Sequence, residues 1–133
     1  MNIVGIDGKH YKFNPKYRKP SDKCSKLHYR CRKLLQQIFP YDTAYEEIFL
    51  PGSRQYNKLR ALKIDFYIPK EALMIEVDGE QHFKMVSHYH KTKLEFLEAQ
   101  SCDSDKNLWC ELNNICLIRL KYDETNKEWE DKI

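Results

Sequence analysis

The chain has 133 residues, of which 41% are hydrophobic and 32% are charged, which is enough for one core of ordinary size and too little for two full domains. This composition excludes a low-complexity disordered chain, and no apolar run reaches the roughly 20 residues that a membrane helix needs. The N-terminus lacks the charged-then-apolar layout of a signal peptide. We therefore expect a soluble, intracellular protein with no membrane partner.

The formal net charge of +3 conceals an uneven distribution along the chain. Residues 1–63 carry 14 basic and 5 acidic side chains, whereas residues 64–133 carry 9 and 15. The two halves therefore have different tasks, the first suited to a polyanion and the second to cations.

The five cysteines predict neither a disulfide framework nor a zinc site. Their number is odd and no C-x-x-C pair occurs. The spacing of zinc ligands is also absent from both candidate sets, which are Cys102, Cys110 and Cys116, and His82, His88 and His90.

Residues 1–20 read as a basic hairpin or arm, and the segment from Cys24 to Phe39 reads as an amphipathic helix that stops before Pro40. Its apolar positions recur at helical spacing: Leu27, Cys31, Leu34, Leu35 and Ile38. On the opposite side three cations follow the same spacing, Lys26, Arg30 and Lys33. That line is either a solvated helix face or a surface that contacts phosphates.

The rest of the chain predicts three strands, a helix and a fourth strand. Strands are expected at 46–50, 62–68 and 73–78, and a polar loop with Arg54, Lys58 and Arg60 precedes the second of them. In that second strand, alternation places Leu62, Ile64, Phe66 and Ile68 on one face. A helix over 91–113 follows, with the apolar stripe Leu94, Leu97, Leu108 and Leu112, and then a strand at 115–120.

This order predicts an α/β fold with a mixed sheet and αβββαβ connectivity over residues 21–122, followed by a polar tail over 123–133.

A turn at 69–72 fixes the register of the second and third strands. If these four residues form the loop, facing residues have numbers that sum to 141, so Asp65 faces Glu76 and Lys63 faces Asp78. Opposed carboxylates repel each other unless a cation lies between them. Mg²⁺ binds carboxylate oxygens, and Asp78 adds a third acid on the same face. The alternative is an exposed acidic strand face that binds nothing.

Three segments together resemble nucleases of the PD-(D/E)XK superfamily. They are LKIDFYIP at 62–69, MIEVDGEQHF at 74–83, and Asp103 and Lys106 ahead of WCELNNI at 109–115. The resemblance is to the branch that includes very-short-patch repair endonucleases, some homing endonucleases and small proteins of phages and large viruses. It implies a restriction-endonuclease-like core, Mg²⁺ or Mn²⁺ as cofactor, DNA as partner, and a host cytoplasmic or nuclear location if the protein is viral.

The resemblance also assigns roles to individual residues. Asp65 and Glu76 stand at the two acidic motif positions and are the implied metal ligands, joined by Asp78, which occupies the place where the superfamily usually has lysine. Lys106, paired with Asp103, could replace that lysine, and Lys63 is the rival candidate. Further candidates are Gln81 and His82 for orienting water, Arg119 for a helix or phosphate contact, and Glu47 as an additional acid.

The sequence thus predicts metal-dependent hydrolysis of DNA phosphodiester bonds, site-specific or nicking, with phosphates held by Lys26, Arg30, Lys33, Arg54, Lys58 and Arg60. Two alternatives stay open: a structure-selective nuclease such as a junction resolvase, and a catalytically inactive DNA-binding module on the same fold. A homodimer is also left open.

Overall fold

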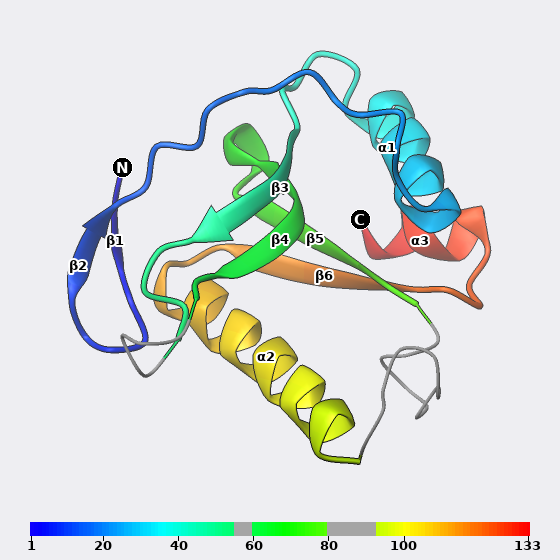
Figure 1. Ribbon diagram of the computed structural model, residues 1–133. Coiled ribbons are helices and arrows are strands. Elements are labelled where there is room, and N and C mark those ends of the chain that lie inside the picture. Colours follow the sequence, from blue (N-terminus) through cyan, green and yellow to red (C-terminus); the bar gives the residue numbers. More distant parts are fainter. Residues whose placement is uncertain (55–59, 80–92) are drawn as a thin grey trace.

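The computed structural model describes residues 1–54, 60–79 and 93–133 (Figure 1). The elements are β1 (Asn2–Val4), β2 (His10–Lys12), α1 (Lys26–Ile38), β3 (Tyr45–Leu50), β4 (Leu62–Ile68), the 3₁₀ turn η1 (Pro69–Glu71), β5 (Leu73–Asp78), α2 (Lys93–Leu112), β6 (Cys116–Lys121) and α3 (Asn126–Lys132). The predicted αβββαβ order is therefore present from α1 to β6, preceded by a hairpin and followed by a third helix.

The four-stranded sheet is mixed, with strand order β3-β4-β5-β6. β3, β4 and β5 are successively antiparallel, whereas β6 runs parallel to β5 because α2 carries the chain back between them. The predicted register is confirmed for the pairs Phe66 with Ile75, Tyr67 with Met74 and Ile68 with Leu73.

Two buried clusters place the helices on opposite faces of the sheet. One cluster joins the sheet to α1 and α3 and includes Cys31, Phe66, Ile75, Leu120 and Trp129. The other joins the sheet to α2 and the N-terminal hairpin and includes Ile3, Phe13, Ile64, Met74 and Trp109. The hairpin is therefore part of the core.

β4 does not keep one apolar face, contrary to the alternation expected from the sequence. Phe66 and Ile68 pack under α1, but Ile64 packs in the cluster under α2. The change of face falls between Ile64 and Phe66, so Asp65 lies at an irregularity in the strand.

The leucine stripe predicted to bury α2 is exposed instead. Leu94, Leu97, Leu108 and Leu112 are all solvent-accessible, while Trp109 and Cys110 make the core contact. The Trp109 indole donates a hydrogen bond to the Pro51 carbonyl at 2.8 Å. α2 faces the sheet with a partly polar side because charged groups on β5 and β6 need partners there.

Residues 123–133 are not a polar tail. Thr125 caps α3 and forms a capping box with Glu128, and Trp129 is fully buried in the cluster that includes residues of α1. The helix α3 lies beside α1 (Figure 1). The indole of Trp129 donates to the Lys121 carbonyl at 3.0 Å. Trp129 is the one aromatic side chain of this segment and attaches it to the core, which the polar composition of the segment did not indicate. Among the described helices, none is long and apolar enough to cross a bilayer.

Two glycines let the hairpin approach the end of β3. The Ile6 amide donates to the Gly52 carbonyl at 2.8 Å, and a Cβ at Gly52 would lie 2.8 Å from the Gly5 Cα. Gly52 also has a φ of 68°, a left-handed conformation that disfavours other residues.

We predict that Gly52→Ala lowers the free energy of unfolding by roughly 2–4 kcal/mol, because it adds a backbone clash to left-handed strain. Gly8→Ala is the matched control, since Gly8 has a φ of 81° and open space around it. It should cost only about 1–2 kcal/mol. Equal losses in urea unfolding would show that the close approach has no energetic weight.

Candidate functional site

Asp65 is unpaired on both sides of β4: the ladder with β3 is interrupted there, and the ladder with β5 ends just before it. Towards β3, the pairs Glu46 with Phe66 and Ile48 with Ile64 flank an unpaired position where Glu47 would meet Asp65. Glu47 has a φ of 52°, which is incompatible with a regular strand. Towards β5, pairing ends at Phe66 with Ile75, just before Asp65 would meet Glu76.

Side chains take over the hydrogen bonds that the ladder between β4 and β5 lacks at this point. The Val77 amide donates to Asp65 Oδ2 at 2.8 Å, and the Asp65 amide donates to Glu76 Oε1 at 3.3 Å. Each carboxylate thus accepts from the backbone of the opposite strand. The predicted direct pairing of Asp65 with Glu76 is absent from the ladder, but these reciprocal hydrogen bonds hold the two side chains together between β4 and β5.

Lys106 completes a buried group of charges around Glu76. Its Nζ lies 3.2 Å from Glu76 Oε1, and both side chains are almost fully enclosed, with exposed fractions of 12% and 5%. Burial raises the pKa of the Glu76 carboxyl to about 7, the negative charge of Asp65 adds to the rise, and Lys106 opposes it. Glu76 is therefore a carboxyl that ionises near neutral pH in the metal-free protein.

Asp78 does not join Asp65 and Glu76 in a group of three acids. It belongs to a neighbouring network of charges. Arg119 NH1 lies 3.5 Å from Asp78 Oδ1 and 3.6 Å from Asp103 Oδ1, and NH2 donates to the Asp103 carbonyl at 2.8 Å. Arg119 therefore contacts α2, the first of the roles that the sequence left open for it. The network ties β5 and β6 to α2.

The expected set of three metal-binding acids is not present. Within residues 1–54, 60–79 and 93–133, no group of three or more His, Cys, Asp or Glu side chains is arranged to hold a metal ion. Asp78 lies beside Arg119, and a metal ion held by these acids stays a prediction. Asp65 and Glu76 nevertheless offer the oxygen donors that Mg²⁺ takes from proteins, which commonly supply one or two carboxylates.

Lys63 does not face Asp78. It pairs with Phe49 on β3, and its Nζ lies 3.9 Å from Glu47 Oε1. The interruption at Asp65 ends the β4–β5 ladder before this register could extend to Lys63. Of the two rival lysines, Lys106 is the one in contact with an acidic motif residue.

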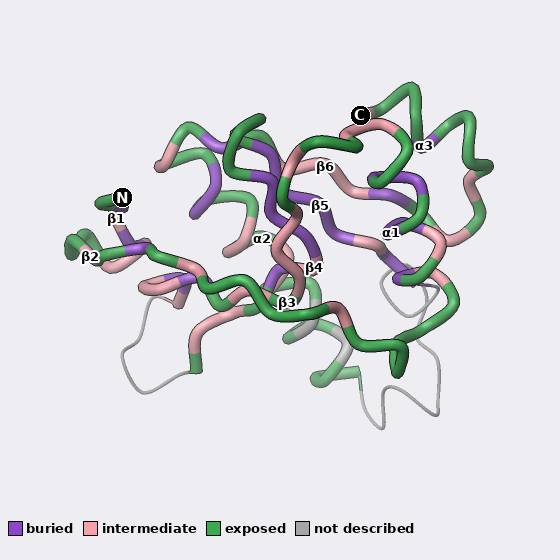
Figure 2. The backbone as a smooth tube through the Cα atoms, turned by 90° about the horizontal axis from the view of Figure 1, so that it is seen from above, coloured by how far each residue is buried: buried purple, intermediate pink, exposed green. Residues whose placement is uncertain are grey.

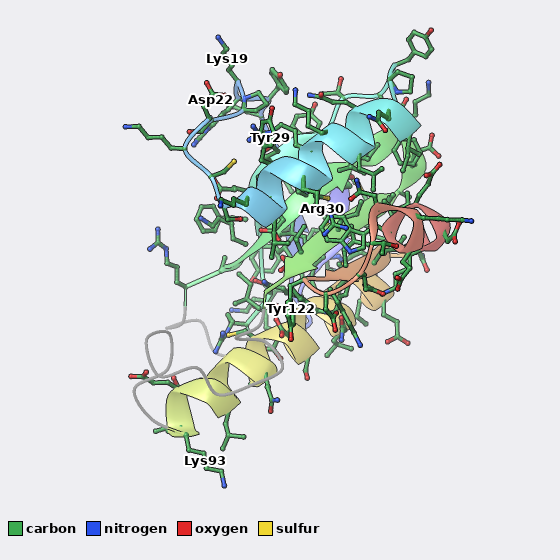
Figure 3. All side chains as sticks on the ribbon, turned by 90° about the vertical axis from the view of Figure 1, so that its right-hand side faces the viewer. Lys19, Asp22, Tyr29, Arg30, Lys93 and Tyr122 are labelled. Atoms are coloured by element: carbon green, nitrogen blue, oxygen red, sulfur yellow. The ribbon has the colours of Figure 1, made fainter. Side chains whose placement is uncertain are left out.

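The cations proposed for phosphate contact differ in their surroundings. Arg30 extends from α1 towards α3 (Figure 3). It stacks 3.7 Å from the Trp129 ring and donates to the Glu124 carbonyl at 2.6 Å. Arg54 contacts α2 through Asp105 at 3.8 Å. These two arginines hold elements together, so the predicted line on α1 is reduced to the exposed Lys26 and Lys33. Arg60 is exposed and lies 5.5 Å from the Phe49 ring.

Five residues considered in the sequence analysis lie outside the described residues: Lys58, Gln81, His82, His88 and His90.

A buried triad on α1 and β3 was not found from the sequence. Arg32 Nε donates to Glu46 Oε2 at 2.8 Å, and His28 Nε2 lies 2.6 Å from Glu46 Oε1. Burial works to raise the pKa of Glu46, but these two partners outweigh it and lower that pKa overall. The available signal was weak: His28 and Arg32 flank the apolar stripe of α1 four residues apart.

Comparisons with known proteins give relatives without an assigned activity. No family model and no solved structure matches the chain. Similar proteins are uncharacterized protein 307L of Invertebrate iridescent virus 6, 43% identical over 61 residues, and uncharacterized protein 033L of Invertebrate iridescent virus 3, 30% identical over 94 residues. These matches cover 46% and 69% of this chain. They cover 31% and 46% of the relatives, so the chain spans less than half the length of the curated proteins it matches.

The raised pKa of Glu76 predicts a specific pH dependence of stability without metal. The unfolded carboxyl ionises near its usual value of 4.5, whereas the folded one keeps its proton until about pH 7. Stability should therefore fall as pH rises from about 4.5 to 7, by on the order of 2–3 kcal/mol, and then level off. Glu76→Gln should remove this slope.

The measurement is urea unfolding across that pH window in EDTA, with Glu76→Gln subtracted from wild type to remove the contributions of other groups. A difference that is flat, or that rises with pH, would contradict the assigned environment of Glu76.

Proposed function

We propose that the protein is a metal-dependent nuclease that hydrolyses phosphodiester bonds, with its centre at Asp65, Glu76 and Lys106. The observation that carries the proposal is the buried contact of Lys106 Nζ with Glu76 Oε1 at 3.2 Å, beside the reciprocal bonds of Asp65 and Glu76. Enclosing two acids and a lysine together costs free energy, because each buried charge loses its hydration. Such groupings are typical of functional sites.

Each residue has a role that follows from its contacts. Asp65 and Glu76 would hold Mg²⁺ or Mn²⁺, since their oxygens are hard donors and their backbone hydrogen bonds restrain them. Bound there, the ion would lower the pKa of a water and offset charge on the phosphate. Lys106 supplies a positive charge that can move from Glu76 to a phosphate oxygen when the ion occupies the carboxylates.

The PD-(D/E)XK resemblance supports this assignment of roles. Asp65 and Glu76 occupy its acidic positions, and Lys106 stands in for the motif lysine that Asp78 replaces. The mixed sheet with αβββαβ order is compatible with a restriction-endonuclease-like core. DNA is the proposed partner, and the iridescent virus relatives favour a viral protein acting inside its host cell.

The rival is a DNA-binding module that has lost catalysis. Asp78 at the lysine position favours it, as does its pairing with Arg119, since that ion pair occupies a residue that would otherwise face the substrate. Nuclease and module differ in one property, which is turnover.

Turnover is tested with supercoiled plasmid and with labelled single-stranded, duplex, flap and junction DNA, each incubated with Mg²⁺ or Mn²⁺. We predict cleavage by wild type, a loss of at least roughly 100-fold in Asp65→Asn and Glu76→Gln, and a comparable loss in Lys106→Met. DNA binding in EDTA should persist in all three variants.

Glu111→Gln and Lys93→Met are the matched controls, because they change exposed residues on α2 by the same chemistry. Both should retain full activity. If wild type leaves every substrate intact with either metal, the binding module replaces the nuclease.

A further inference from the structure

Residues 12–24, which lead from the end of β2 towards α1, form one wall of a groove whose other wall is the edge strand β3. This segment follows the outer side of the sheet and is mostly exposed, as Figures 1 and 2 show. The groove has a volume of about 580 Å³. We call residues 12–24 the arm and this cavity the arm groove.

The arm groove is strongly basic. Its cations are Lys12, Lys16, Arg18, Lys19, Lys23 and Lys63, together with Arg32 on the floor. Among the described residues, the acids that line it are Glu46 and Glu47, and each has a cationic partner in the groove, Arg32 and Lys63 respectively. The five cations of the arm form no ion pair with any described residue. Figure 3 shows Lys19 extending away from the fold.

An exposed aromatic side chain lines the arm groove. Phe49 is 47% exposed although it is large and apolar, and it lines the groove. Arg60 and Lys63 lie 5.5 and 5.8 Å from its ring. An exposed ring with cations beside it can stack a base while the cations hold the adjoining phosphates.

The arm groove passes beside the proposed centre at Glu47. Glu47 lines the groove and stands at the position of β3 where it would meet Asp65 of β4. Asp65, Glu76 and Lys106 do not themselves line the groove, so Glu47 is what connects the groove to the centre.

We propose that the arm groove binds a single strand of nucleic acid beside the Asp65 and Glu76 centre. This inference rests on the proposed nuclease function and narrows its substrate to single-stranded segments. A basic groove with an exposed aromatic ring suits unstacked bases, whereas the bases of a duplex are stacked on each other and offer Phe49 no free face.

The test measures binding in EDTA, so that it is independent of cleavage. Fluorescence anisotropy follows labelled oligothymidine and oligouridine of roughly 15 nucleotides, and a duplex of equal length, between about 50 and 300 mM salt. Wild type should bind a single strand at least roughly tenfold more tightly than the duplex. The two oligomers show whether DNA or RNA is preferred.

Charge reversal in the arm, Lys16→Glu with Arg18→Glu and Lys19→Glu, should weaken single-strand binding at least roughly tenfold and reduce the salt slope by about 2. Phe49→Ala should weaken it roughly fivefold or more without changing that slope. The control reverses three exposed lysines elsewhere, Lys70→Glu with Lys93→Glu and Lys127→Glu. The control variant should bind single strands more tightly than the arm variant, and its affinity should fall more steeply with salt.

Equal losses in the arm and control variants, or duplex binding as tight as single-strand binding, would overturn the groove assignment. Neither result bears on turnover, so the nuclease proposal would stand. Conversely, a protein without turnover that still binds single strands through the arm would keep the groove and lose the nuclease. Circular dichroism of every variant confirms that it is folded.

Discussion

The structure depends on the exchange of hydrogen bonds between Asp65 and β5 and between Glu76 and β4. Where the strands stop pairing through their backbones, Val77 donates to Asp65 and the amide of Asp65 donates to Glu76. Without these bonds the backbone groups would be unsatisfied at a partly buried position. The same bonds hold two acids close together, so an interruption in the sheet is also what creates the candidate site.

The inner face of α2 follows from this constraint. A buried Glu76 needs a cation, and Lys106 supplies it from α2. Arg119 on β6 adds a second connection to the same helix through Asp103. The helix therefore turns polar residues towards the sheet and leaves Leu94 and Leu97 exposed. An apolar stripe in a helix sequence indicates burial only when no charged group in the core needs a partner from the other face of that helix.

The sequence was sufficient for features that depend on neighbours in the chain. A four-residue turn at 69–72 set the register that brings Asp65 to Glu76, and the periods of the strands and helices gave their order. Contacts between distant segments were not accessible in this way. His28 and Arg32 meet Glu46, Arg119 meets Asp78, and Trp129 packs beside α1, because tertiary packing selects partners that no local spacing encodes. The arm groove was also not predicted, because the sequence shows the arm only as a basic segment near the N-terminus.

Calorimetric titration with Mn²⁺ would show whether Asp65 and Glu76 together bind a divalent ion, as proposed above. Saturable uptake by wild type should disappear in Asp65→Asn and survive in Asp78→Asn, because Asp78 is held by Arg119 instead of facing the other two acids. Absence of uptake by the wild-type protein, or uptake that requires Asp78 and tolerates loss of Asp65, would contradict the proposal.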